Sequence, residues 1–484
     1  MSEPKNDVAA SLSRDGASRS EARADRDDQK PIAAAASRRS FLKSAAAGLA
    51  IFHIVPSHVL GGAGGRAPSE KLRIACIGVG GRGRASVDRC AQEGHEIVAL
   101  CDVDDREAGA TYKAYPKAKR FRDFRVMLDE ISDEIDAVTV GTPDHTHAVA
   151  VMAALRRGKH VYCEKPLAHS IHEIRAIMRL AAEKDVTTQL GNQGHSFDSI
   201  RTCREWIESG VIGEVTEVHA GCDAFPHVYC QLDKLPKVEE QHEIPKELDY
   251  DLWLGPTPKI AYSPLWVPWN WRGWMPFGTG AVGDWGCHVL DPAFWALALG
   301  SPTSVRAEVD SKYHPEKHRL VYPPGTKITY EFPANGSRGP VKLIWFDGNK
   351  RIPKGEGIDG EAPGTGAIVY GKKGAIVHGS HGAANVRIGA EALAKDFKKP
   401  EPSIPRVRKN DHHNDWLDSI AAGKKAGSDI ATYGGPLTEV ALLGAIAIRF
   451  PGETLEWDAK AMKVTNIAEA NKLVAPEYRD GWTL

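Results

Sequence analysis

The chain has 484 residues, of which 42% are hydrophobic and 26% charged, which is enough to bury a sizeable core and to form two or more domains. Lysine and arginine together number 62 and aspartate and glutamate 63, so the formal net charge is −1. With no excess of either sign, the composition gives no reason to expect a nucleic acid or an anionic membrane as a partner.

The first 67 residues are expected to stand apart from the folded domains. Residues 1–36 are rich in Ser, Ala, Asp and Arg with few large apolar side chains, which predicts disorder. Residues 37–43 read Ser-Arg-Arg-Ser-Phe-Leu-Lys and precede an apolar run at 45–55 and a small-residue run at 61–67. This order resembles a twin-arginine export signal and predicts a periplasmic protein, with no membrane segment after signal removal. A short amphipathic helix or an uncleaved anchor is the alternative.

The eight cysteines predict neither a metal centre nor a disulfide framework, because none forms a Cys-x-x-Cys pair and their density is low. Cys76, Cys101 and Cys163 fall in apolar, strand-like runs, where a thiol normally serves packing. Cys222 and Cys230 could form a disulfide after export.

From residue 71 onward, strand-like runs alternate with helical patterns. The expected strands span 72–77, 97–101, 137–140, 160–163 and 187–190, and helical patterns lie between them, for example at 148–157 and 171–184. Such alternation predicts an α/β fold with a parallel, doubly wound sheet and right-handed crossovers. Ligands of these sheets bind at the carboxyl ends of the strands, so the residues that follow each strand are the candidates for function.

A glycine-rich turn follows the first expected strand. Its G-x-G-x-x-G spacing places backbone amides and a helix N-terminus where they can hold a pyrophosphate. Asp102 ends the second strand about 20 residues further on, where a carboxylate hydrogen-bonds the ribose hydroxyls and repels a 2′-phosphate. We therefore expect NAD as the cofactor; the alternative for Asp102 is a solvated turn residue. The turn residues expected to contact NAD are Gly78, Gly80, Gly81, Arg82 and Gly83.

The run Thr-Pro-Asp-His-Thr-His at 142–147 follows the strand 137–140 and lies on the same expected rim. We expect Thr142, Pro143 and His147 to contact the nucleotide or the substrate. The alternative is a helix cap formed by Asp144 or Thr146. Two histidines two residues apart also raise the question of a metal, but no third ligand with suitable spacing lies nearby, so none is expected.

Glu164-Lys165-Pro166 closes the strand 160–163, and here the chain resembles the Gfo/Idh/MocA family, which includes glucose-fructose oxidoreductase and inositol dehydrogenase. The resemblance implies that Lys165 reaches the active site and assists proton transfer at a substrate hydroxyl. Proline restricts the backbone before it and so fixes the direction of Lys165. The alternative is a surface lysine at a strand end. Further candidates for cofactor contacts at the strand ends are Glu164, Asn192 and Gln193.

Asp284 and His288 lie in the glycine-rich run 280–291. If this run is helical, the two side chains are at i and i+4 and project from one face, so both can address one substrate carbon. The pair resembles the Asp-x-x-x-His motif of the same family, which implies that His288 is the general base and that Asp284 positions the substrate or the histidine. The alternative is a helix end that both side chains satisfy.

Tryptophans are dense between the Glu-Lys-Pro motif and His288. Most of them are expected to pack a core, and one or two near His288 would suit the apolar faces of a sugar ring. Trp271 and Arg272 are the candidates for substrate contact. Arg272 could meet a hydroxyl, a carboxylate or the cofactor, and spacing alone does not decide among them.

The family resemblance extends from about residue 72 to residue 484 and implies the domain organisation. It implies a Rossmann domain at 68–192, followed by an α+β domain at 193–484 with a large, mostly antiparallel sheet that also mediates homo-oligomer formation. Strand-like runs at 215–220, 327–332 and 341–346 agree with this sheet. Near the C-terminus, His412 or His413 could approach the site, and a charged helix cap is the alternative.

Three functional hypotheses follow. The first is an NAD-dependent oxidoreductase that acts on a secondary hydroxyl of a sugar, a sugar derivative or a cyclic polyol, with Lys165, Asp284 and His288 around the reacting carbon. Free NAD is not recycled outside the cytoplasm, which motivates the second: an NAD-assisted glycosidase that oxidises a sugar carbon transiently, eliminates the aglycone, adds water and reduces the carbon again. The third is a sugar- or NAD-sensing protein without turnover.

Overall fold

The computed structural model describes residues 70–484. The expected twin-arginine signal and the rest of the segment 1–67 lie outside the described residues.

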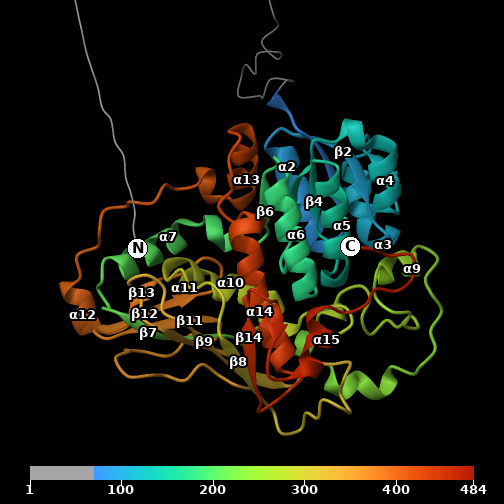
Figure 1. The fold of residues 1–484 in the computed structure, drawn as a ribbon. Helices are drawn as coiled ribbons and strands as arrows, with labels where there is room; N and C mark the ends of the chain where they lie inside the picture. The colour runs from blue at the N-terminus through green and yellow to red at the C-terminus, as the bar shows by residue number, and fades with distance from the viewer. Residues whose placement is uncertain (1–69) are drawn as a thin grey trace, which may run out of the picture. The chain divides into compact units, whose positions relative to one another are not determined.

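The N-terminal part of the described chain is built on a six-stranded sheet (Figure 1). The strand order is β3-β2-β1-β4-β5-β6, and all neighbours run parallel. This is the doubly wound order of dinucleotide-binding sheets, which confirms the predicted Rossmann sheet. Its strands are β1 (Arg73–Ile77), β2 (Glu96–Cys101), β3 (Lys119–Phe121), β4 (Ala137–Val140), β5 (His160–Cys163) and β6 (Thr188–Leu190).

The helices of this part are α2 (Gly81–Gln92), α3 (Asp105–Ala114), α4 (Phe124–Ile131), α5 (Asp144–Arg156) and α6 (Ile171–Glu183), whereas α7 (Asp198–Glu208) packs against α11 (Asp291–Ala296) of the C-terminal part. α6 shows how the sequence sets a boundary: Ser170 and Glu173 form a capping box at its start, which satisfies two backbone N–H groups reciprocally. α5 begins four residues earlier than the helical pattern at 148–157 predicts, because Pro143 takes the N-cap position and Asp144 opens the helix.

The C-terminal part contains a nine-stranded sheet of order β13-β12-β11-β7-β10-β9-β8-β14-β15. Only β7 and β10 pair in parallel, and the other neighbours pair antiparallel, as predicted for the second sheet. The strands are β7 (Val215–Cys222), β8 (Ser304–Val309), β9 (Gly325–Phe332), β10 (Val341–Gly348), β11 (Gly366–Gly371), β12 (Gly374–Gly379), β13 (Arg387–Ile388), β14 (Thr454–Asp458) and β15 (Lys463–Val464).

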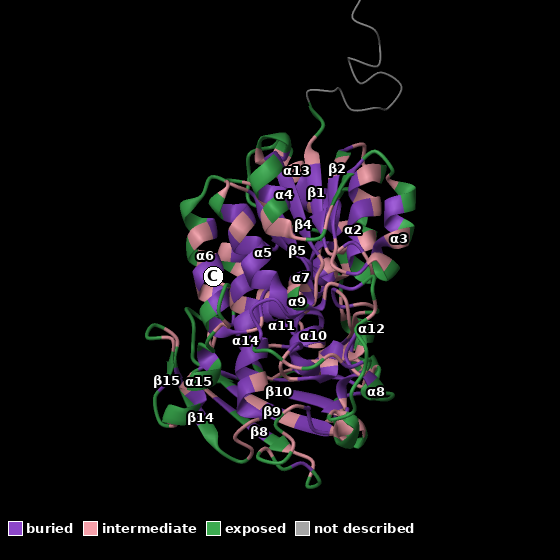
Figure 2. Cartoon of the chain, turned by 90° about the vertical axis from the view of Figure 1, so that its right-hand side faces the viewer, coloured by how far each residue is buried: buried purple, intermediate pink, exposed green. Residues whose placement is uncertain are grey.

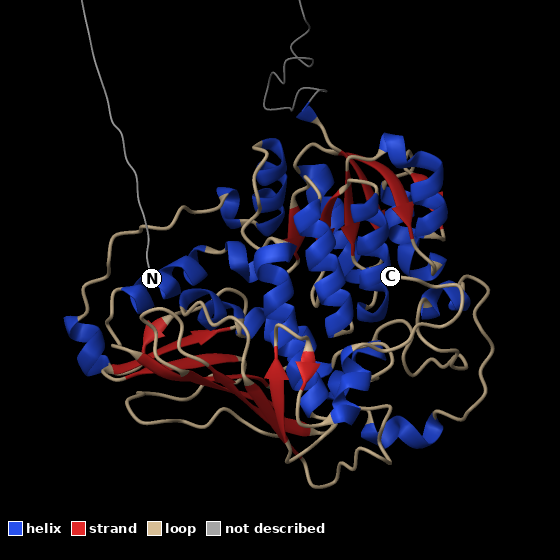
Figure 3. Cartoon of the chain, viewed as in Figure 1, coloured by secondary structure: helices blue, strands red, loops and turns tan. Residues whose placement is uncertain are grey.

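Some helices of the C-terminal part lie between the two sheets, and others flank the second sheet or the Rossmann sheet (Figure 3). They are α8 (Pro226–Tyr229), α9 (Tyr250–Leu254), α10 (Gly280–Val289), α11 (Asp291–Ala296), α12 (Glu391–Asp396), α13 (His412–Ala421), α14 (Gly435–Ala447) and α15 (Asn471–Val474). The stretch Ile430–Ala447 is apolar enough to cross a membrane by composition, but 72% of it is buried inside the fold. It packs against α6 and α10 as a core helix.

The buried residues form a continuous interior that runs from one sheet to the other (Figure 2). α13 returns to the Rossmann sheet, where Trp416 and Leu417 join a cluster with Ile74 and Leu100 from β1 and β2. All eight cysteines are free thiols, so the disulfide considered for Cys222 and Cys230 is not formed.

Candidate active site

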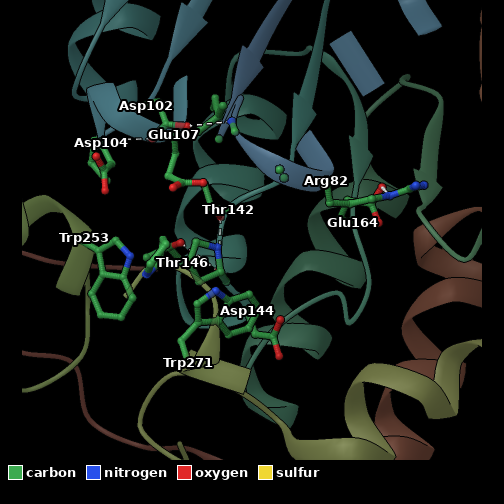
Figure 4. Close-up of a pocket in the computed structure, with 18 of the residues that line it drawn as sticks. Arg82, Asp102, Asp104, Glu107, Thr142, Asp144, Thr146, Glu164, Trp253 and Trp271 are labelled. Carbon is green, nitrogen blue, oxygen red and sulfur yellow. Dashed lines mark hydrogen bonds and ion pairs between the residues drawn. The ribbon is translucent and has the colours of Figure 1, made fainter. Parts of the chain in front are cut away.

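A groove of about 160 Å³ lies at the carboxyl ends of the parallel strands (Figure 4). Its walls come from the glycine turn after β1, from the residues after β2, β4 and β5, and from α10 and the tryptophan-rich segment before it. The predicted site residues that line it are Gly78, Gly80, Gly81, Arg82, Asp102, Thr142, Pro143, His147, Glu164, Lys165, Trp271, Arg272 and Asp284. One groove therefore joins the nucleotide-type turn to the Lys165 motif.

The glycine turn leaves no room for side chains at two of its positions. A Cβ on Gly83 would lie 1.8 Å from the Gly78 carbonyl oxygen, and one on Gly78 would lie 2.6 Å from the Thr142 nitrogen. Gly78 also has a φ of +73°, which favours glycine. α2 starts directly behind the turn, with no acidic side chain in its first turn. A close-packed turn that opens onto an uncompensated helix N-terminus fits the pyrophosphate of a dinucleotide.

Asp102 directly follows β2, and its side chain holds the glycine turn through hydrogen bonds to the backbone. Its Oδ2 accepts hydrogen bonds from the backbone N–H groups of Val79 (2.8 Å) and Gly80 (3.2 Å), and its Oδ1 accepts one from Asp104 (3.0 Å). Burial raises the pKa of Asp102, and these three N–H donors oppose the shift. The predicted carboxylate is therefore present on the rim, with a second task in fixing the turn that precedes α2.

We expect the substitution Asp102→Asn to damage the turn as well as the nucleotide site. Asparagine has one carbonyl oxygen, so its amide nitrogen must face a backbone N–H that Asp102 now binds. An unsatisfied buried donor costs about 1–3 kcal/mol. The free energy of unfolding should fall by that amount, and the dissociation constant for NAD should rise; calorimetry on one preparation gives both. Wild-type stability combined with unchanged NAD affinity would contradict this role.

The run 142–147 performs structural tasks beyond the predicted nucleotide contact. His147 is buried, and its two ring nitrogens face the carbonyl oxygens of Thr142 (2.8 Å) and Pro166 (2.7 Å). It thereby ties together the ends of β4 and β5, and a cofactor could meet only its carbon atoms. Asp144 accepts hydrogen bonds from Thr279 N (3.2 Å) and Thr279 Oγ1 (2.8 Å), the residue that precedes α10. Asp144 thus anchors the N-cap residue of α10, whereas the N-cap of α5 is Pro143, without a side-chain cap, so the alternative of a cap by Asp144 or Thr146 is not what the structure shows.

Glu164 is 4% exposed and pairs with Arg82, whose Nε lies 3.0 Å from Glu164 Oε1. Gln193 donates to both Glu164 oxygens at 3.2 Å. Arg82 and Gln193, both predicted to contact the cofactor, thus hold Glu164, a third predicted contact, in place. Asn192 is fully buried and donates to Asp291 (3.1 Å), and it is not among the residues that line the groove.

Lys165 and Asp284 meet at the inner end of the groove, although they lie in different halves of the chain. Lys165 Nζ forms an ion pair with Asp284 Oδ1 and lies 3.2 Å from the Asp284 carbonyl oxygen. The other carboxylate oxygen, Oδ2, accepts the hydroxyl of Tyr229 and lies 3.4 Å from Arg272 Nε. Burial would raise the pKa of Asp284, but the charges of Lys165 and Arg272 and the hydrogen bonds outweigh it and lower the pKa to about 2. Asp284 is a fixed anion.

A second cavity, which fewer residues line than line the groove and which we term the smaller cavity, continues from this ion pair. His288 lines it from α10, the helix predicted for the Asp284 and His288 pair. Among the described residues none hydrogen-bonds His288, and its Nδ1 is buried without a partner, so the rest of the ring faces the cavity. The ring stacks on His381 with centroids 4.0 Å apart. Burial, together with the charge of Lys165, holds the pKa of His288 well below the ordinary histidine value.

Several residues of this cavity escape sequence reasoning. Tyr229 binds Asp284, Trp285 Nε1 donates to the Tyr229 hydroxyl at 2.8 Å, and His381 enters from the loop after β12. Tyr229 and His381 lie in no recognisable motif, and Trp285 lies between Asp284 and His288 but was not singled out there. Trp271, predicted to contact substrate, lines the groove and not this cavity.

His412 and His413 do not reach either cavity. His412 binds the Leu190 carbonyl (2.7 Å) and lies by Ser196, while His413 stacks on Tyr162. Their helix has a charged cap, as the alternative expected, but Asp411 forms it and neither histidine does. Across residues 70–484, no group of three His, Cys, Asp or Glu side chains is arranged to hold a metal ion.

Two family models match this chain. The description "Oxidoreductase family, NAD-binding Rossmann fold" fits residues 72–192, and "Oxidoreductase family, C-terminal alpha/beta domain" fits residues 198–484. Inositol 2-dehydrogenase of Rubrobacter xylanophilus is 31% identical over 153 residues, which are 31% of this chain and 43% of that protein. Levoglucosan dehydrogenase of Pseudarthrobacter phenanthrenivorans is 28% identical over 196 residues, 40% of each chain. The alignments thus span less than half of these relatives.

Solved structures agree on the fold. The WlbA dehydrogenase of Bordetella pertussis, determined in complex with NADH and UDP-GlcNAcA, superposes with a TM-score of 0.55 at 16% identity. The match covers 80% of this chain and 99% of that one.

Proposed function

Because the chain belongs to the Gfo/Idh/MocA oxidoreductase family, with an NAD-binding Rossmann domain, we propose that it is an NAD-dependent dehydrogenase of sugars, sugar derivatives or cyclic polyols. The observation that carries this proposal is the position of Lys165 and Asp284, which line both the groove and the smaller cavity. The groove takes the dinucleotide and the cavity takes the substrate. The reacting carbon then lies where the two meet.

The residues of the groove suit NAD. The glycine turn approaches the pyrophosphate, and Asp102 places a carboxylate beside the ribose, where a 2′-phosphate would be repelled. When bound, NAD supplies the hydride acceptor for oxidation of a secondary hydroxyl. Lys165 and Asp284 form the floor at the junction, and their fixed pairing orients the ammonium group toward the substrate oxygen.

His288 is the general base of this proposal. Its imidazole is held neutral by burial and by the nearby charge of Lys165, so it can accept the hydroxyl proton near neutral pH. The Lys165 ammonium donates a hydrogen bond to the same hydroxyl oxygen and favours release of its proton. Asp284 keeps Lys165 in place without competing for the proton, because its own pKa is about 2.

The test is formation of NADH, followed by absorbance, when the purified protein is given NAD and a panel of aldoses, sugar acids, anhydrosugars and inositols. At least one of them should be oxidised. Binding of NAD without turnover on every compound would favour the sensing hypothesis instead.

We expect His288→Ala to lower kcat by about 100-fold or more, the usual contribution of a positioned acid or base. In the unchanged enzyme, His288 should lose its function only as pH falls below the ordinary histidine pKa, because its own pKa is depressed. If kcat/KM already declines, as pH is lowered, at values well above 6.5, this would argue against His288 as the base. A control is His314→Ala, which changes an exposed histidine in a loop that lines neither cavity.

The NAD-assisted glycosidase is the second candidate. It is favoured by the presence of two proton-transfer groups, Lys165 and His288, at one cavity, since removal of a hydroxyl proton needs only one. Elimination of an aglycone needs a second. Release of p-nitrophenol from nitrophenyl glycosides by protein that carries its own NAD, with no NADH accumulating, would establish this candidate over the dehydrogenase.

A further inference from the structure

The mouth of the smaller cavity carries two exposed aromatic rings. Phe225, in the segment between β7 and α8, is 56% exposed, and Trp269, which precedes Trp271, is 55% exposed. Both line the cavity that holds His288. Large apolar side chains that remain exposed around a binding cavity mark a contact with something outside the fold.

The backbone holds Phe225 in an unfavourable conformation. Its φ and ψ of 51° and 46° lie in the left-handed region, although it is a bulky residue that directly precedes Pro226. Such a conformation costs about 1–2 kcal/mol for a residue other than glycine, asparagine or aspartate. Packing inside the protein gives little compensation, because more than half of the residue is exposed. The local structure thus presents an aromatic ring at a position where glycine would be easier to accommodate.

Trp269 lines the cavity, and its ring also contacts a charged side chain. The guanidinium carbon of Arg272 lies 4.2 Å from the centre of the Trp269 ring, and the same guanidinium lies 4.2 Å from Trp271. Arg272 in turn is held beside Asp284. The ring of Trp269 therefore packs against Arg272, which Asp284 holds in place, and about half of it remains exposed.

Aromatic rings continue from this rim to the proposed base. Phe225 stacks on Trp285 with centroids 6.3 Å apart, Trp285 meets His381 edge-on at 5.6 Å, and His381 stacks on His288. Arg82, with a side chain 44% exposed, also lines the cavity and has N–H donors beyond the one that Glu164 accepts. The wall thus combines flat apolar faces with hydrogen-bond donors, which is the chemistry that binds pyranose or aryl rings.

We infer that the substrate carries a second ring, so that this protein binds glycosides or oligosaccharides more tightly than free monosaccharides. The reacting sugar lies inside, against Lys165 and His288, and the second ring, a sugar or an aryl group, packs against Phe225 and Trp269 at the mouth. This inference rests on the proposed function for the inner position only. The rim is continuous with the cavity, which favours a ligand ring over a protein partner.

The test compares ligands that differ only in the outer group. Dissociation constants of methyl and phenyl glycosides of glucose, galactose and N-acetylglucosamine are measured by calorimetry, with the full chain saturated with NAD. For at least one sugar, the phenyl glycoside should bind about tenfold more tightly, as one stacked aromatic contact allows. Phe225→Ala is the cleaner variant, because Phe225 lines the smaller cavity alone, whereas Trp269 also lines the groove.

In Phe225→Ala and Trp269→Ala, the preference for phenyl over methyl should fall about five- to tenfold. The control Val126→Ala removes an exposed apolar side chain from α4 and should keep the wild-type preference. Equal affinity for both glycosides, no binding of any of them, or an unchanged preference in both rim variants would overturn the inference. A molecular mass of the rim variants in solution that differs from the wild-type mass would also overturn it, because the rim would then be a subunit interface. A phenyl preference without NADH formation from any sugar would uphold the second-ring site and reject the proposed function.

Discussion

Replacement of Lys165 by methionine should lower kcat by about 1000-fold while NAD still binds. Methionine retains most of the length and apolar stem of lysine but removes the ammonium group that meets Asp284 at the junction of groove and cavity. The substrate hydroxyl then loses its charged hydrogen-bond donor. Single-turnover measurement of NADH formation separates this chemical effect from product release, and fluorescence titration gives the NAD affinity.

Two further variants make the Lys165 result interpretable. Lys165→Met leaves the buried Asp284 carboxylate with fewer partners, and an uncompensated buried charge is itself destabilising. The double variant Lys165→Met/Asp284→Asn removes that charge as well but leaves Arg272 without its carboxylate partner, so it should recover neither turnover nor the full wild-type stability. Lys119→Met should leave kcat unchanged, because it removes an exposed lysine of β3 whose partner is Glu134. If Lys165→Met keeps near-normal turnover, the lysine is a structural partner of Asp284 and not part of the reaction.

Gly83→Ala should weaken NAD binding by about 100-fold or more. The new methyl group would lie 1.8 Å from the Gly78 carbonyl oxygen, a backbone atom that cannot move without displacing the whole turn. Overpacking of this kind costs roughly 3 kcal/mol, which corresponds to about two orders of magnitude in a binding constant if the turn shifts. Differential scanning calorimetry with and without NAD should show a lower melting temperature and a smaller stabilisation by the ligand.

Gly109→Ala is the matched control for that substitution. Gly109 lies within α3, and a Cβ there meets nothing within 4 Å. Alanine favours a helix interior over glycine by about 1 kcal/mol, so this variant should be slightly more stable than the wild type and bind NAD normally. If both variants lost NAD affinity to a similar extent, the contact of the new methyl group at Gly83 would not be the cause. The packing of the turn would then not set the nucleotide affinity.

The periodic parts of the fold could be predicted from sequence. The expected strands at 137–140 and 160–163 coincide with β4 and β5, since both runs are short, mostly apolar and rich in β-branched or aromatic residues between turn residues. β3, which has three residues with little burial, gives no such signal and was not predicted. In the second sheet, Val215–Cys222 and Val341–Gly348 extend past the predicted runs, because pairing between these strands continues through residues with weak strand patterns.

Site residues could be predicted where a local motif carried them and not where tertiary contacts did. Lys165 follows a strand and Asp284 lies on a helix, and both were accessible to pattern reasoning. Tyr229 ends the short helix α8 and His381 lies in the loop after β12, and only the packing of the second sheet against α10 brings them to the cavity. Asn192 illustrates the opposite error, because position at a strand end does not reveal that the side chain turns inward toward Asp291.

The contacts of α10 have a consequence for protein engineering. Asp144, from the Rossmann part, binds Thr279 just before α10, and Lys165, from the same part, pairs with Asp284 within it. The helix that presents His288 is thus positioned from both halves of the chain. The two halves are not interchangeable modules: a chimera with another C-terminal half would assemble this site only if the incoming half offered a Thr279-like donor and an Asp284-like acceptor in the same register. Substrate range should therefore be easier to alter through the loops around Phe225 and His381 than by exchange of whole domains.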